Sequence, residues 1–101
     1  MSDSPARVDI AGDGWRVAGA LTMDTAATLL AESRDIPLPP SGVVDLRNVE
    51  VVDSAGVAVL LAWKRRAFSE GIRLMFEGLP PTLTSLAELY GVEDLLQEVA
   101  A

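Results

Sequence analysis

The residues of this chain best suited to recognition or chemistry stand together at one junction, Asp53-Ser54-Ala55-Gly56. A carboxylate and a hydroxyl are adjacent there, directly before a long segment with a helical pattern. Either Asp53 or Ser54 can act as an N-cap, because a side-chain oxygen accepts hydrogen bonds from the free N–H groups of the first helical turn. Ala55 and Gly56 have small side chains, so another surface can approach the first turn closely. The junction is therefore the first candidate for a binding site.

Catalytic side chains are scarce in the rest of the sequence. The 101 residues include no Cys and no His, which excludes a thiol nucleophile, a disulfide, an imidazole base and a Cys/His zinc site. The single Lys, Lys64, stands beside two arginines, so an enzyme would have to use carboxylates alone. Gly12-Asp13-Gly14 is a turn rather than a phosphate loop, because no third glycine and no helix follow it. We predict no enzymatic activity, no metal and no cofactor.

The charge balance excludes further classes of function. Fifteen acidic and eight basic residues give a formal charge of −7, and such a surface repels nucleic-acid phosphates and anionic lipid headgroups. The longest uncharged apolar run, residues 55–63, is too short to span the ~30 Å hydrocarbon core of a bilayer. Residues 1–5 lack the basic and apolar regions of a signal peptide. The sequence predicts a cytoplasmic protein that binds neither nucleic acid nor membrane directly.

Alternation of polar and apolar residues, with turn signals, predicts the elements that position the junction. Strands are expected at 7–11, 15–21, 42–46 and 72–77, with a tight turn at 12–14 and a brief extension at 51–52. Helices are expected from Thr22 or Asp24 to Ser33 and over 54–69, 81–90 and 92–99. The fold class is α/β, with a mixed sheet of about four strands and helices packed mainly on one face. A single domain, 7–99, is expected after a disordered tail at 1–6.

The helix expected over 54–69 carries more apolar surface than a sheet alone usually buries. Its core stripe consists of Gly56, Val59, Leu60, Trp63 and Ala67. Val57, Leu61 and Phe68 widen the apolar arc to about 200°. Two interpretations remain open: neighbouring helices cover the surplus, or Val57 and Leu61 form an exposed docking patch beyond Ser54.

The run from Asp53 to Leu61, following Val44-Asp45-Leu46, resembles the signature of the STAS domain family. The resemblance covers residues 15–97 and includes the strand end at 17–21 and the segment 86–92. This family includes bacterial anti-sigma-factor antagonists and the MlaB-type subunits of phospholipid transporters. In antagonists, the position matched by Ser54 holds a serine that is regulated by phosphorylation. In MlaB-type members, a hydroxyl residue there lies at the contact with the transporter ATPase, MlaF.

Two departures favour the MlaB type over the antagonists. Gly19-Ala20-Leu21-Thr22 lacks both acidic residues that antagonists commonly carry at this strand end, and Ala55 replaces their second hydroxyl residue. Near-minimal length and the ending at 86–92 also look more like the MlaB type.

The resemblance implies a cytoplasmic STAS-domain accessory subunit that binds and supports the MlaF-like ATPase of a phospholipid-transporting ABC complex. Such a complex maintains outer-membrane lipid asymmetry, and its partner would hold this chain at the inner face of the inner membrane. The predicted partner-binding residues are Asp53, Ser54, Ala55, Gly56, Val57, Ala58 and Leu61. The alternative is an anti-sigma-factor antagonist, whose partner is an anti-sigma factor kinase that phosphorylates Ser54.

Overall fold

The alternating N-terminal residues form a hairpin in the computed structural model, which describes residues 6–96. Strands β1 (Arg7–Ala11) and β2 (Gly14–Leu21) pair antiparallel, and Ala11 faces Gly14 across a two-residue turn. Gly12 has a φ of 63°, the positive value that the first residue of a type II′ turn needs. The hairpin therefore begins and ends close to the predicted residues.

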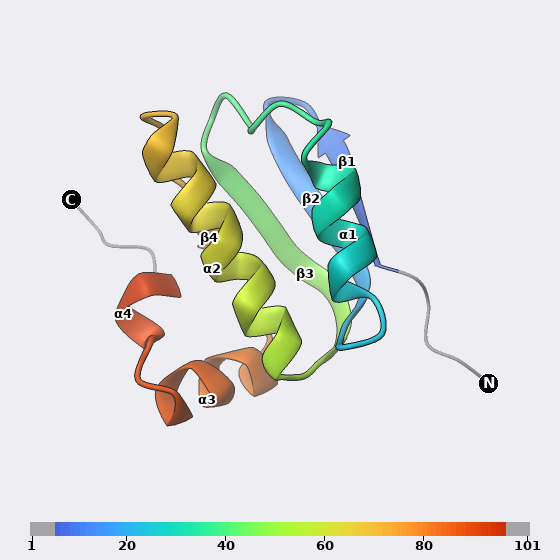
Figure 1. Cartoon of the computed structure of the whole chain (residues 1–101), viewed down its shortest axis with the longest axis vertical. Coiled ribbons are helices and arrows are strands. Elements are labelled where there is room, and N and C mark those ends of the chain that lie inside the picture. The colour runs from blue at the N-terminus through green and yellow to red at the C-terminus, as the bar shows by residue number, and fades with distance from the viewer. Residues whose placement is uncertain (1–5, 97–101) are drawn as a thin grey trace.

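Helices and parallel strands alternate through the rest of the chain. Helix α1 (Ala26–Ser33) leads to β3 (Val43–Val52), and α2 (Ser54–Ser69) leads to β4 (Met75–Glu77). Two short helices follow, α3 (Pro81–Leu89) and α4 (Glu93–Leu96). The sheet order is β1-β2-β3-β4, with parallel β2–β3 and β3–β4 pairs. Helices α1 and α2 cover the same face of the sheet (Figure 1), which confirms the predicted mixed four-stranded α/β fold.

The central strand is longer than predicted. β3 is one continuous strand of ten residues, where the sequence pattern suggested a strand at 42–46 and a separate extension at 51–52. Its pairing with β2 shifts register between Arg16 and Ala18 and again between Gly19 and Ala20. These irregularities allow the polar residues Arg47, Asn48 and Glu50 to stay exposed while pairing continues.

Other boundaries also differ from prediction. The N-cap of α1 is Thr25, not Thr22 or Asp24, and residues 22–25 form a turn before it in which the Thr22 carbonyl accepts hydrogen bonds from the N–H groups of Thr25 and Ala26. β4 begins only at Met75. Ala6, assigned to the predicted tail, is partly buried against the core. Residues 1–5 of that tail and 97–99 of the last predicted helix lie outside the described residues.

A pair of tryptophans forms the centre of the core between the sheet and the helices. The rings of Trp15, on β2, and Trp63, on α2, meet edge to face, with centroids 5.4 Å apart and planes at 78°. Trp63 Nε1 donates a hydrogen bond to Ser33 Oγ, and Trp15 Nε1 donates one to the Pro37 carbonyl. Each indole N–H therefore has a partner inside the fold, as burial requires. Trp63 is a core residue, as predicted.

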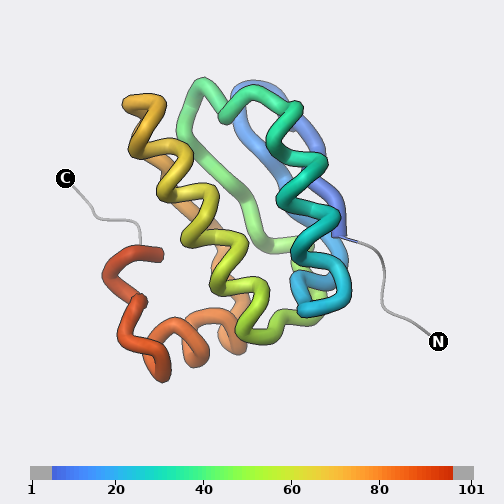
Figure 2. The backbone as a smooth tube through the Cα atoms, viewed as in Figure 1, coloured from blue at the N-terminus to red at the C-terminus, as the bar shows by residue number. Residues whose placement is uncertain are grey.

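An arginine fastens α1 to α2, which run alongside each other over the sheet (Figure 2). Arg66 of α2 donates to the carbonyl oxygens of Ser33 and Ile36 at 2.9 and 2.8 Å, and pairs with Glu70 at 2.9 Å. The Arg66 guanidinium therefore joins α2 to the last residue of α1 and to the loop that follows it.

Candidate protein-binding site

Asp53 is the N-cap of α2 and holds the candidate site together. One carboxylate oxygen accepts a hydrogen bond from the N–H of Ala55 at 2.8 Å, and the other accepts one from the N–H of Met23 at 2.9 Å. The Asp53 N–H donates to the Leu21 carbonyl. Asp53 thus ties the end of β2 and the loop after it to the first turn of α2. Both carboxylate oxygens are used within the fold, which is a structural role.

Ser54 follows the cap and is exposed. No hydrogen bond engages its hydroxyl within residues 6–96. Of the two cap candidates, Asp53 therefore takes the structural role and Ser54 remains available to an outside group. Met23, held next to the start of α2 by Asp53, is 78% exposed, and the sequence analysis did not place it at the site.

The loop that carries Met23 is fixed by a threonine. Thr25 Oγ1 accepts a hydrogen bond from the Thr22 N–H at 3.0 Å and donates one to the Ala20 carbonyl. These bonds join both ends of the loop to the end of β2. The exposed Met23 side chain is therefore presented from an anchored backbone.

Gly56 faces inward, contrary to the expectation that its small size serves an approaching surface. A Cβ atom at this position would lie 2.8 Å from the Leu21 carbonyl oxygen and 3.0 Å from Val52 Cγ1. Gly56 therefore allows α2 to cross closely over the ends of β2 and β3. Its contribution to the site is to set the position of the helix start.

Gly56→Ala is expected to destabilise the domain by about 1–3 kcal/mol, because the added methyl group overpacks against a backbone carbonyl that cannot move aside. This loss should exceed the gain of about 1 kcal/mol that alanine normally brings to a helix. Urea unfolding measures it. The control is the reverse change at an exposed position of the same helix, Ala58→Gly, which should cost about 1 kcal/mol. A Gly56→Ala variant more stable than the parent would contradict the close contact.

The docking patch proposed from the sequence is wrong for Val57. Its side chain is only 4% exposed and belongs to the same buried cluster as Leu83 and Ala87 of α3. α3 and α4 pack against α2, and they contribute residues to the core in which Val57 is buried. The alternative interpretation, in which neighbouring helices cover the surplus apolar arc, is correct there. Leu61 is intermediate, partly buried against the core.

The exposed surface of α2 runs along a different line, which we term the α2 stripe. It consists of Ser54, Ala58, Leu61, Arg65 and Phe68, spaced four, three, four and three residues apart. Such spacing places all five on one side of a helix. Phe68 is 87% exposed. Of the predicted partner-binding residues, Ser54, Ala58 and Leu61 lie on this stripe, whereas Asp53, Ala55, Gly56 and Val57 support it from the side or below.

The C-terminal half of the stripe borders a groove toward α4. Leu61, Lys64, Arg65, Phe68 and Leu95 line it. Lys64 Nζ lies 5.7 Å from the centroid of the Phe76 ring. Burial, with a smaller effect from the Arg73 charge, lowers the pKa of Lys64. The groove is therefore mainly apolar, with cationic groups at its rim.

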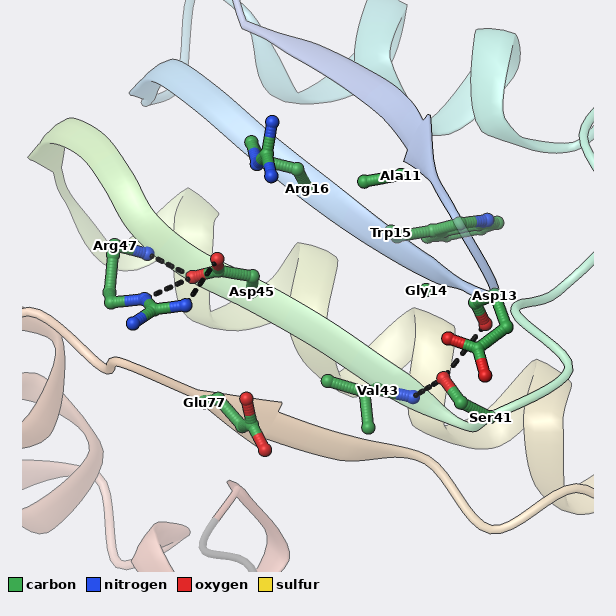
Figure 3. Close-up of a pocket in the computed structure, with 10 residues that line it drawn as sticks. All are labelled: Ala11, Asp13, Gly14, Trp15, Arg16, Ser41, Val43, Asp45, Arg47 and Glu77. Atoms are coloured by element: carbon green, nitrogen blue, oxygen red, sulfur yellow. Dashed lines mark hydrogen bonds and ion pairs between the residues drawn. The ribbon is translucent and has the colours of Figure 1, made fainter.

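A hollow on the opposite face of the sheet is lined mainly by polar residues, two of which, Asp45 and Arg47, are paired with each other (Figure 3). Asp45 accepts hydrogen bonds from the backbone N–H and the guanidinium of Arg47. These bonds lower the pKa of Asp45 below its ordinary value. Within residues 6–96 no group of three acidic side chains is placed to hold a metal ion. We find no arrangement in this hollow that points to a ligand.

The fold and the α2 junction together define a small α/β domain whose exposed helix side suits protein recognition. A family model described as "Mlab, STAS domain" matches residues 6–97, and the chain belongs to that family. The predicted resemblance to STAS domains of the MlaB type is thus confirmed. No curated protein sequence matches the chain at a significant level. In the part of the chain that the structure describes, no helix is long and apolar enough to cross a membrane.

Proposed function

We propose that this chain is a cytoplasmic accessory subunit that binds and supports the ATPase of a phospholipid-transporting ABC complex. The MlaB name of its family supports a complex that transports phospholipid. In this proposal the partner holds the chain at the inner face of the inner membrane. The chain itself carries out no catalysis and binds no cofactor.

One observation carries the proposal: Asp53 serves as the N-cap of α2, whereas the neighbouring Ser54 is exposed. Asp53 caps α2 through the Ala55 N–H and also binds the Met23 N–H, so the cap does not need Ser54, which presents its hydroxyl at the exposed end of α2. The helix N-terminus adds a partial positive charge beside it. A partner surface with an acceptor oxygen and an apolar strip therefore matches Ser54, Ala58 and Leu61.

Docking on this surface would act by stabilising one arrangement of the ATPase. A bound subunit favours whichever partner conformation it binds more tightly, and it shifts the equilibrium by that difference in affinity. α2 is held by the core, by Asp53 and by Arg66, so it presents a preorganised surface. Preorganisation lowers the entropic cost of association.

Ala58→Arg should abolish partner binding while the isolated domain stays folded. Ala58 is exposed, and arginine is a good helix former, but in the complex the charge would be buried without a partner. Such burial costs about 3–5 kcal/mol, which corresponds to at least about a hundredfold weaker binding. Titration of the purified ATPase with each variant measures it.

The matched control is Ala31→Arg, the same change at an exposed position of α1, which should bind like the parent. Equal binding by the Ala58→Arg variant would refute the α2 stripe as the docking surface. Failure of the parent chain to bind any ABC ATPase would refute the proposal that its partner is such an ATPase.

The exposed Ser54 hydroxyl also keeps the alternative, an anti-sigma-factor antagonist, open to the same assay. A kinase could reach this hydroxyl, and a helix N-terminus tolerates a phosphate. Capture of an anti-sigma factor kinase, together with phosphate on Ser54 in mass spectra of protein from cells, would move the assignment to that function.

A further inference from the structure

β1 is an edge strand whose outward backbone groups are unused. Ala11 and Gly14 close a two-residue turn, so they exchange backbone hydrogen bonds. Because such pairs alternate along an antiparallel ladder, Arg7 and Asp9 also bond to β2, whereas the N–H and C=O groups of Val8 and Ile10 point away from it. Within residues 6–96 these outward groups have no hydrogen-bond partner. An edge of this kind is a template for another strand.

The polar face of the sheet carries a row of alternating charge that stops at this edge. Asp45 of β3 faces Arg16 of β2, and Arg16 faces Asp9 of β1. Arg16 and Asp45 both appear on this face in Figure 3. Arg7 lies two residues from Asp9 and pairs with it at 3.1 Å, with both side chains at least half exposed. A further strand that continued the row would place a cation opposite Asp9 and an anion opposite Arg7.

β1 of a second copy meets this requirement. In an antiparallel pair centred on Val8, Arg7 lies opposite the second copy's Asp9, and Asp9 lies opposite the second copy's Arg7. The outward-pointing groups of Val8 and Ile10 then meet those of Val8 and Ala6 of the second copy. A pair centred on Asp9 would oppose like charges, and one centred on Ile10 would place Ala11 opposite Asp9.

The helix-bearing face of the sheet is compatible with this pairing. Ile10 is 65% exposed at the edge, beside an apolar hollow formed with Trp15 and the loop residues 37–40. The pairing would place Ile10 against Ala6 of the second copy. α1 contacts β1, and three of its four exposed residues are small, namely Ala27, Thr28 and Ala31, while the fourth is Glu32.

We propose that two copies of this chain associate antiparallel through β1, with a twofold axis at Val8, and form one continuous sheet. The surface involved lies on β1 and α1 and is separate from the α2 stripe. This dimer is tested on the purified full chain without any ATPase, so its failure leaves the proposed function untouched.

Sedimentation velocity of the full chain should show a dimer at about 200 μM that dissociates on dilution, because an interface of one strand pair is small and weak. Arg7→Asp should be monomeric, since the introduced carboxylate would face the second copy's Asp9. Asp9→Arg should also be monomeric, since the introduced guanidinium would face the second copy's Arg7. An equal mixture of these two variants should again sediment as a dimer, because every opposed pair is then of opposite charge.

Two controls keep the result interpretable. Arg34→Asp and Asp35→Arg make the same charge changes at exposed positions after α1 and should remain dimeric. Ile10→Pro removes an outward N–H without touching the β2 ladder and should be monomeric, with circular dichroism like the parent. A monomeric parent at this concentration, or a mixture of the two charge variants that stays monomeric, would overturn the proposal.

Discussion

Val57→Arg is expected to unfold the domain. The side chain is almost completely buried, in the same apolar cluster as residues of α3, so the guanidinium would lose its hydration without gaining a counter-ion. An uncompensated buried charge costs about 3–5 kcal/mol or more, and small domains have only about 5–15 kcal/mol of stability in total. Far-ultraviolet circular dichroism and thermal unfolding measure the effect.

The neighbouring substitution Ala58→Arg provides the matched control, because it places the same side chain one residue along α2 on the exposed side. The Ala58→Arg variant should stay folded and have the same thermal unfolding midpoint as the parent. A folded Val57→Arg protein that fails to bind its partner would instead restore the docking patch that the sequence first suggested.

Trp63→Ala should destabilise the domain by about 3–5 kcal/mol, as large-to-small changes in a core do. The substitution removes the edge-to-face contact with Trp15 and leaves the buried Ser33 hydroxyl without its donor. Urea unfolding curves give the free-energy difference.

Trp63→Phe separates these two contributions. It keeps an aromatic ring against Trp15 but removes the indole N–H, and a lost buried hydrogen bond costs about 1–3 kcal/mol. The phenylalanine variant should therefore fall between the alanine variant and the parent. Equal losses in the two variants would show that the hydrogen bond to Ser33, rather than ring packing, dominates.

The parts of the fold that local sequence determines were predictable. The turn at Gly12, the core stripe of α2 and the helix end before Gly71 follow from backbone conformation and apolar periodicity, which involve neighbours only a few residues apart. The resemblance of the run from Asp53 to Leu61 to STAS domains was sufficient to predict the family. It depends on residue identity at a single junction and needs no knowledge of packing.

The parts that depend on distant contacts were not predictable. Val57 is buried in a core that α3 and α4 help to form, and a helical wheel of α2 does not contain those elements. The bond from Asp53 to the N–H of Met23 joins residues thirty positions apart, so the presence of Met23 at the site could not be inferred from the sequence. The continuity of β3 through Arg47 and Asn48 depends on irregular pairing with β2, which leaves no periodic signal.

The tryptophan pair makes the core optically distinct from the surface. Both tryptophans of the chain are in contact inside the fold, and the single tyrosine, Tyr90, is half exposed at the end of α3. The electronic transitions of two indoles in edge-to-face contact are coupled. Near-ultraviolet circular dichroism and the fluorescence emission maximum therefore report whether the core is intact. Because both tryptophans are almost completely buried and neither lies on the α2 stripe, those signals should stay constant when that stripe is covered. Optical melting curves of this chain therefore report loss of the core, and association appears in them as a shift of the melting midpoint.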